Sequence, residues 1–530
     1  MTSFASSAQA WGRLSSGTGS ADPFTAFVAI QGSNQIATIA TKSNTPGGVI
    51  SLPTGTAPRH VAITPDNRTA YVADTGTNKV TPIDVATNTT LAPITVGPAP
   101  WGIAVTPDGK TVYVTASGGG AVTPIDVATN TAAHAITVGT APLGIAITPD
   151  GTTAYVANNS SDTVTPITLA TNTAGKAIAV GSGPYGVAIT PDGKFAYVTN
   201  SGAGTVTPID TTTNVAGATF SVGTFPEDIA VTPIAVPPRI YVANQGNASV
   251  SVINPSNRTT AEFSVPNSQP SGIAITPDGT QAYVSDIGNG RVYPVDISSG
   301  FGVVGTPISV GATPRGIAIT KYQAGLATQA TASVRPGGSI SDTATLSNVL
   351  IPTGSVTFTL YGPNDPTCSG APVFASTKAP TRGSPTATAV SDAFVPPAPG
   401  TYRWVASYSG DFSNSAVGPT ACGATGEIST VSGSTAFPGV SVYRPSTGEW
   451  YFNSPPVAAT FGGQPGDIPV PGEYDGDGKV DMAVYRPSVG TWYIHNSSSG
   501  TDTLLNYGVS TDLPVPAAYD GSGRTNIAVY

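Results

Sequence analysis

The stretch GIAVTPDGKTVYVTASGGGAVTPIDVATNTAAHAITVG, residues 102–139, decides the fold because its pattern recurs along more than half of the chain. It consists of short runs of apolar and β-branched residues, separated by a TPDG turn and by loops rich in Gly and Asn. Such runs, with turn signals every few residues, are typical of antiparallel strands. We expect four strands from this unit, at residues 102–106, 111–116, 121–127 and 135–139.

The unit recurs about every 42 residues between residues 24 and 320. The chain starts this region with the second, third and fourth strands of a unit and ends it with a lone first strand at residues 314–320. We therefore predict an all-β fold whose first part is a seven-bladed β-propeller with four-stranded blades, the two ends sharing one blade so that no sheet edge stays open. Pro124 inside the third strand, repeated in other units, predicts a bulge or a strand start there. The landmark prolines before the first strands are Pro58, Pro100, Pro142, Pro184, Pro226, Pro270 and Pro314.

Three copies of the unit resemble a known repeat family. The phrases AYVANNSSDTVTPI (154–167), AYVTNSGAGTVTPID (196–210) and IYVANQGNASVSVI (240–253) resemble the YVTN β-propeller repeats of surface-layer-like and periplasmic proteins. The resemblance implies a cell-surface, structural or binding role, and it brings no catalytic residues with it.

The rest of the chain divides into four further segments. Residues 1–23 are expected to form a disordered arm, and residues 321–326 a linker. Residues 327–432 contain PTGSVTFTLYG (352–362) and GTYRWVASYSGD (400–411), which resemble bacterial Ig-like modules and imply a β-sandwich. Residues 433–530 contain VSVYRPSTGEWYFN (440–453) and MAVYRPSVGTWYIHN (482–496), which resemble FG-GAP/VCBS-type repeats in an apparently incomplete set.

Composition restricts the compartment and the partners. Only 10% of residues are charged and the net charge is −9, so no basic stripe is present for nucleic acid or an anionic membrane. No apolar run of transmembrane length occurs. Cys368 and Cys422 predict one disulfide of an exported protein, with two buried thiols as the alternative. We expect an extracellular or cell-surface location, although the first twenty residues lack a signal peptide; the alternative is a start site assigned too far downstream.

An acidic loop near the C-terminus predicts a calcium site. Glu473, Asp475, Asp477 and Asp481 alternate along a Gly-containing loop, and the carbonyl oxygen of Lys479 would complete the set. Ca²⁺ prefers six to eight oxygen ligands, which such a loop brings together. The alternative is a solvated acidic turn.

One position in the propeller repeat varies while its neighbours hardly change. If the loop before the innermost strand lies at a channel mouth, the residues after the landmark prolines form a ring with mixed chemistry, suited to binding. The alternative is an unconstrained surface position. The ring comprises Arg59, Trp101, Leu143, Tyr185, Glu227, Ser271 and Arg315, with His60 beside the first of them.

The sequence favours a non-enzymatic function. The three histidines lie in separate contexts and no nucleophile has a recognisable base. We therefore expect an exported surface protein whose propeller binds a protein or a glycan, with an Ig-like spacer and a calcium-stabilised C-terminal repeat. The alternatives are a propeller enzyme, a lactone hydrolase or a lyase acting in the central channel, and a self-associating lattice component.

Overall fold

The repeat units fold into seven antiparallel sheets, one for each predicted blade. The computed structural model describes residues 24–233, 238–335, 337–431, 442–453, 456–476, 480–496, 498–517 and 524–530. The expected arm at residues 1–23 lies outside the described residues. The innermost strands are β4 (Pro58–Ile63), β9 (Pro100–Val105), β14 (Pro142–Ile147), β19 (Pro184–Ile189), β24 (Pro226–Val231), β28 (Pro270–Ile275) and β33 (Pro314–Ile319).

The second and third strands of each blade are regular and mostly six residues long. The second strands are β1 (Thr25–Ile30), β5 (Thr69–Asp74), β10 (Thr111–Ala116), β15 (Thr153–Asn158), β20 (Phe195–Asn200), β25 (Ile240–Asn244) and β29 (Gln281–Asp286). The third strands are β2 (Gln35–Ala40), β6 (Lys79–Asp84), β11 (Ala121–Asp126), β16 (Thr163–Thr168), β21 (Thr205–Asp210), β26 (Ser249–Asn254) and β30 (Arg291–Asp296). Short 3-10 turns, η1 (Gln31–Ser33) and η2 (Gln245–Asn247), follow β1 and β25.

The ring closes as predicted, because the two ends of the propeller share one sheet. This sheet has the order β3-β2-β1-β33, and β1 pairs antiparallel with β33, with Phe27 opposite Ala318. The backbone N–H of Thr320 also donates to the carbonyl oxygen of Thr25. Closure gives β33, which would otherwise be a lone strand, a partner in β1 and completes the four-stranded sheet.

The fourth strand differs from the prediction in five blades, where it is split into two short pieces. In these blades the third strand contains a proline, and in the other two, with β3 (Thr45–Ser51) and β27 (Thr259–Ser264), the fourth strand is continuous. Proline has no N–H to donate to the outer strand, so the ladder is interrupted opposite it. The split pairs are β7 (Thr89–Thr90) with β8 (Ile94–Thr95), β12 (Thr131–Ala132) with β13 (Ile136–Thr137), β17 (Thr173–Ala174) with β18 (Ile178–Ala179), β22 (Val215–Ala216) with β23 (Phe220–Ser221), and β31 (Val303–Val304) with β32 (Ile308–Ser309).

The core of the propeller lies between neighbouring blades. In one such layer the buried Tyr71 and Val80 of one blade pack with Val112 and Ile125 of the next. The repeated tyrosine also reaches across the boundary, since Tyr71 Oη donates to Asn130 Oδ1 at 2.8 Å. Each blade therefore needs its neighbour to bury its apolar face and to satisfy this hydroxyl.

The middle part of the chain forms two facing sheets. One has the order β34-β36-β39 and the other β35-β41-β40-β37-β38, and both contribute to one core around the buried Trp404. Cys368 and Cys422 form a disulfide in this part. The strands are β34 (Gly325–Ala330), β35 (Ser333–Val334), β36 (Asp342–Ser347), β37 (Val356–Tyr361), β38 (Phe374–Lys378), β39 (Thr386–Val390), β40 (Gly400–Tyr408) and β41 (Ile428–Val431).

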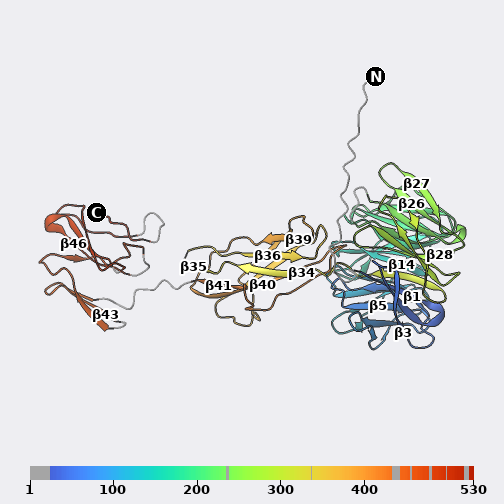
Figure 1. Cartoon of the computed structure of the whole chain (residues 1–530). Coiled ribbons are helices and arrows are strands. Elements are labelled where there is room, and N and C mark those ends of the chain that lie inside the picture. The colour runs from blue at the N-terminus through green and yellow to red at the C-terminus, as the bar shows by residue number, and fades with distance from the viewer. Residues whose placement is uncertain are drawn as a thin grey trace, which may run out of the picture.

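This sandwich lies directly against the propeller (Figure 1). Ser413 Oγ donates to the carbonyl oxygen of Pro277 at 2.7 Å, and the N–H of Ala416 donates to the carbonyl oxygen of Pro65 at 2.9 Å. Lys321, in the expected linker, exchanges two backbone hydrogen bonds with the Asn67 side chain. The residues between the two parts are thus tied to the propeller.

The C-terminal part contains two further small sheets with repeated aromatic pairs. Tyr443 packs on Trp450 with ring centroids 4.8 Å apart, and Tyr485 on Trp492 at 5.3 Å. The strands are β42 (Val442–Arg444), β43 (Glu449–Asn453), β44 (Pro456–Thr460), β45 (Ile468–Pro469), β46 (Met482–Arg486), β47 (Thr491–His495) and β48 (Asp502–Asn506), with η3 (Pro487–Val489) between β46 and β47. Across all the described parts, no helix has the length and apolar character needed to span a membrane.

Candidate functional site

The seven innermost strands surround the axis of the propeller. Each touches the next one along the chain, and β33 touches β4. Each strand begins at its landmark proline, so the variable residue is the second residue of the strand. The sequence had suggested that it lies in the loop before the strand. None of the seven variable side chains is exposed: Leu143, Glu227 and Ser271 are buried and the other four are half-buried.

Aromatic and cationic side chains from three blades form one half of this ring. The guanidinium carbon of Arg59 lies 3.5 Å from the ring centroid of Trp101, a cation–π contact. Trp101 in turn meets the edge of Tyr185, with ring centroids 6.0 Å apart. Strands β4, β9 and β19 thus bring together three residues that lie far apart in the sequence.

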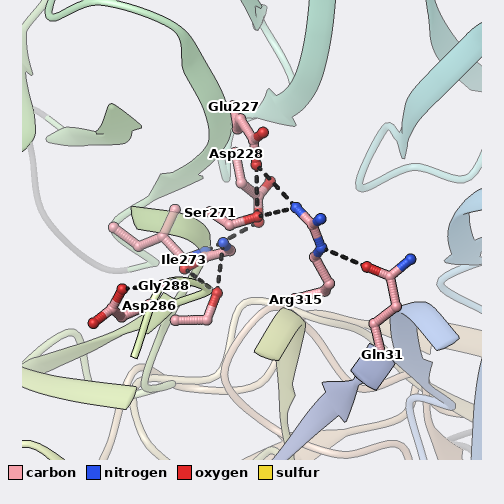
Figure 2. A network of polar contacts seen from close by, with 10 residues as sticks. Gln31, Glu227, Asp228, Ser271, Ile273, Asp286, Gly288 and Arg315 are labelled. Carbon is pink, nitrogen blue, oxygen red and sulfur yellow. Dashed lines mark hydrogen bonds and ion pairs between the residues drawn. The ribbon is translucent and has the colours of Figure 1, made fainter. Parts of the chain in front are cut away.

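A polar network forms the other half of the ring (Figure 2). Ser271 Oγ donates to Glu227 Oε2 at 2.6 Å, and Arg315 Nη1 lies 3.9 Å from the same oxygen. Arg315 Nε donates to Gln31 Oε1 at 2.9 Å. The network therefore joins β24, β28 and β33 to η1, and it holds the Arg315 guanidinium between a carboxylate and an amide.

Two side chains occur where the other five blades have glycine. The residue after the variable position is glycine wherever the next strand comes very close; a Cβ at Gly144 would lie 2.3 Å from the carbonyl oxygen of Tyr185. His60 and Asp228 replace this glycine, and each bonds to the next blade. His60 Nδ1 lies 3.2 Å from the carbonyl oxygen of Trp101, and Asp228 Oδ2 accepts from the N–H of Ile273 at 3.1 Å.

The surroundings of these groups shift their pKa values. Burial raises the pKa of Asp228 to about 6, opposed by hydrogen bonds from the backbone N–H groups of Ile273 and Ile229. Burial also raises the pKa of Glu227, opposed by Ser271 and by the positive charges of Arg315 and Arg59. Two carboxyl groups with raised pKa values therefore lie next to each other in the chain, beside a cation.

His60 is neutral at pH 7. Burial, together with the charge of Arg59, lowers the pKa of His60 to about 4. Because a carbonyl oxygen only accepts, Nδ1 of the neutral ring carries the proton and donates to Trp101. Nε2 is then left with a lone pair.

Two donors in the aromatic half have no acceptor among the described residues. Arg59 Nε and Trp101 Nε1 are both buried and neither makes a hydrogen bond. Burial, and secondly the charge of Arg315, lower the pKa of Arg59 to about 10, so the side chain is still a cation at neutral pH. Buried donors of this kind would bind an oxygen atom of a substrate.

The remaining predicted site residues contribute less. Leu143 is buried without a polar side-chain contact in the described structure. In the acidic C-terminal loop, Asp481 is buried and its Oδ2 accepts from the N–H of Tyr474 at 2.7 Å, while Asp475 Oδ2 accepts from Ser498 Oγ at 2.6 Å. Glu473 accepts from the N–H of Gly476. Asp477 and Lys479 lie outside the described residues, so the calcium site stays a prediction.

A surface hollow of about 640 Å³ lies elsewhere, at the outer edge of two blades near Asn44, Gln281 and Asp296. Charged groups do not converge there as they do at the axis. We therefore place the candidate active site at the axis.

Sequence reasoning missed Asp228 and Gln31. Asp228 had a signal, because it interrupts the Pro-x-Gly pattern of the repeat as His60 does. Gln31 had none, since it reaches Arg315 only through the closure of the ring.

The fold and the polar axis define this part of the chain as a seven-bladed β-propeller. A family model described as "Lactonase, 7-bladed beta-propeller" matches residues 21–181. No curated protein matches the chain.

Solved structures with propeller folds resemble the chain at low identity. A putative 6-phosphogluconolactonase from Bacteroides uniformis is 18% identical, with 56% of this chain and 100% of that one covered and a TM-score of 0.48. Hydrazine synthase of Kuenenia stuttgartiensis is 22% identical, with coverages of 50% and 90% and a TM-score of 0.46. Virginiamycin B lyase from Staphylococcus aureus is 18% identical, with coverages of 49% and 88% and a TM-score of 0.43.

The expectation of a non-enzymatic protein was wrong. The family model that matches the first blades is that of a lactonase, which favours the enzymatic alternative. The sequence suggested otherwise because the groups at the axis come from separate blades and form no local motif. Their chemistry becomes visible only when the ring is closed.

Proposed function

We propose that the propeller is an enzyme that hydrolyses a cyclic ester at its axis. The observation that carries this proposal is the cluster of Glu227 and Asp228 beside Arg315, with Arg59 facing it from the aromatic half. The match to the lactonase model over residues 21–181 supports the same reaction class.

Asp228 is the best candidate for the general base. A carboxylate whose pKa is about 6 is ionised at neutral pH and still basic enough to accept a proton. In the proposed step Asp228 takes a proton from water while the water oxygen attacks the ester carbonyl carbon. The ring C–O bond then breaks, and the carboxyl group returns the proton to the leaving alkoxide oxygen.

The two arginines would stabilise the negative charge that develops on the carbonyl oxygen. Arg59 has a buried Nε without an acceptor among the described residues, and Trp101 Nε1 offers a second donor nearby. Glu227 and Gln31 act as positioning residues, because they hold the Arg315 guanidinium from two sides. Fixed donors in a buried site stabilise such charge more strongly than water does.

The test is hydrolysis of a panel of γ- and δ-lactones by the full chain, followed by pH-stat and mass spectrometry. Asp228→Asn should lower kcat by roughly 10²- to 10⁴-fold, the usual contribution of a general base. Glu262→Gln is the matched control, because Glu262 lies exposed on β27 of the same blade. Activity unchanged in Asp228→Asn would contradict the assignment, and a product that has not gained water would indicate a lyase instead.

We propose that the propeller repeats are of the YVTN type, that the sandwich is an Ig-like module and that the C-terminal sheets are FG-GAP/VCBS-type repeats. The two facing sheets and the repeated Tyr–Trp pairs support the last two. An extracellular or cell-surface location is supported by the Cys368–Cys422 disulfide, since such bonds persist in oxidising compartments. Thiol labelling of the protein in intact producing cells, with and without reductant, would test it.

We also propose that the acidic loop containing Glu473, Asp475 and Asp481 binds Ca²⁺. The support is the alternation of carboxylates along a short loop, a pattern that can bring several oxygen ligands onto one cation. Calorimetry should show a C-terminal transition that moves up with millimolar calcium and down with chelator. If Asp475→Asn had the same C-terminal transition temperature as the parent and the same upward shift with calcium, the loop would not be the calcium site.

A further inference from the structure

Two acidic side chains are buried in the sandwich, outside the propeller and the acidic C-terminal loop. Asp342 is the first residue of β36 and is 0% exposed, and Glu427 directly precedes β41 and is 1% exposed. The two strands belong to opposite sheets. Ala330 lies next to both acids in the structure. It pairs with Asp342 across the sheet, and its N–H donates to the carbonyl oxygen of Gly426, the residue before Glu427.

These carboxylates have few hydrogen-bond partners. Thr328 Oγ1 donates to Glu427 Oε1. Among the described residues, both side-chain oxygens of Asp342 and Oε2 of Glu427 are buried without a partner at full hydrogen-bond geometry. The backbone N–H groups of Thr343 and Gln329 lie near Asp342 and oppose the rise of its pKa. None of the ion pairs found among the described residues includes either acid.

An arrangement of this kind is unfavourable as it stands. A buried carboxylate costs several kcal/mol unless a counter-charge or hydrogen bonds compensate for the lost water. The two acids also act on each other: burial, and secondly the negative charge of Glu427, raise the pKa of Asp342 to about 7. At pH 7 and above, the pair therefore needs either a proton or a cation.

We propose that Asp342 and Glu427 bind a divalent metal cation between the two sheets of the sandwich, with Ca²⁺ as the preferred ion. Two carboxylates balance one divalent charge. The available ligands are the carboxylate oxygens and the Thr328 hydroxyl beside Glu427, and hard cations prefer oxygen ligands of this kind. Ca²⁺ accepts irregular oxygen geometry and bidentate carboxylates, whereas Mg²⁺ demands near-octahedral sites.

Terbium luminescence tests this site directly, because Tb³⁺ replaces Ca²⁺ and is sensitised by a nearby indole. Trp404 is suitably placed, since its backbone N–H donates to the carbonyl oxygen of Glu427 at 2.8 Å. The full chain is used in an Asp475→Asn/Asp477→Asn background, which disables the C-terminal loop. We expect saturable emission at pH 7.5 that calcium displaces, and its loss in Asp342→Asn/Glu427→Gln.

A second measurement keeps the proposal falsifiable if the double variant folds poorly. Trp404→Phe in the same background should lose the emission but keep an upward shift of the thermal transition with millimolar calcium. Emission that survives the double substitution would overturn the site. The site would also be overturned if, with Asp342 and Glu427 intact, the thermal transition temperature did not respond to calcium but fell as the pH was raised from 5 to 8. That result would show that the two acids share a proton in place of a metal.

Discussion

At the scale of single residues, the repeat allows different side chains at the same position of different blades to be compared. The last residue of the second strand is an asparagine in three blades, and in one of them Asn158 Nδ2 donates to Thr165 Oγ1 at 2.8 Å. Asp74 holds this position in another blade and cannot donate when ionised. Thr81 Oγ1 donates to one of its oxygens at 2.5 Å, and the other is buried with no hydrogen-bond partner in the part of the chain that the structure describes. Burial raises the pKa of Asp74 to about 7.

Asp74→Asn should therefore stabilise the propeller in a pH-dependent way. A folded pKa above the unfolded value means that the stability from proton binding is fully present below about pH 4 and lost as pH rises through about 7. The variant avoids this loss, so its free energy of unfolding should exceed that of the parent by roughly 2 kcal/mol at pH 8 and by much less at pH 4. Denaturant unfolding at both pH values measures the difference.

Asp286→Asn is the matched control, because Asp286 occupies the same repeat position with its oxygens satisfied. Oδ1 accepts from the N–H groups of Gln269 and Gly288, and Oδ2 from Asn289. An amide there would place donors against donors, so no stabilisation is expected. Equal gains in both variants would contradict the explanation.

At the scale of strands, a proline in the third strand decides the form of its neighbour. Pro124 accepts from Ala133 through its carbonyl oxygen but has no N–H to return, and β12 and β13 are separated there. Val252 takes the corresponding place in β26, and β27 is continuous. The sequence showed the prolines, but the bulge or strand start predicted at Pro124 was wrong, because β11 runs without interruption from Ala121 to Asp126 and pairs in regular register with β10. The sequence did not show that the consequence falls on the outer strand, because that depends on which partner lacks its donor.

Pro124→Val should join β12 and β13 into one strand. The new N–H can donate to the outer strand, so amides between residues 131 and 137 should exchange with deuterium more slowly, as is expected for the continuous β27 of the parent. Hydrogen exchange with mass spectrometry measures this, and β17 and β18 serve as the unchanged internal reference. Unchanged exchange at residues 131–137 would contradict the role given to the proline.

At the scale of the whole molecule, one departure from the repeat attaches the sandwich to the propeller. Four TPDG turns place glycine at the position with positive φ, and the first turn has Asn67 there instead, at φ 59°. Its side chain accepts from the N–H of Lys321 at 3.0 Å and donates to the carbonyl oxygen of Lys321 at 2.9 Å. Asparagine tolerates this backbone conformation and adds the docking contacts.

Asn67→Gly should loosen the sandwich without harming the propeller. Glycine suits the turn, so the thermal transition of the propeller should stay in place, while limited proteolysis between residues 321 and 326 should become faster. Gly109→Asn, in the second turn, is the control and should leave proteolysis unchanged. If Asn67→Gly were cleaved at the same rate as the parent, the other contacts would be sufficient to hold the sandwich against the propeller.

Most of the architecture was predictable from the sequence, and most of the candidate active site was not. Blade number and ring closure follow from a repeat whose period and ends are visible, whereas the split of the outer strand in five blades does not. The partners of Arg315 are not visible, because Glu227 and Gln31 lie 88 and 284 residues away along the chain. Only the variable position after each proline, and the two side chains that replace glycine, indicated where to look.

The most direct test of the account is the pH dependence of lactone hydrolysis by the full chain. If Asp228 is the base, kcat should rise as its carboxyl group ionises through about pH 6 and then level off. Asp228→Asn should remove this rise together with most of the activity, whereas Glu262→Gln should keep both. A rise through pH 6 that persists in Asp228→Asn, or no hydrolysis of any lactone in the panel by the parent protein, would contradict a catalytic axis in this propeller.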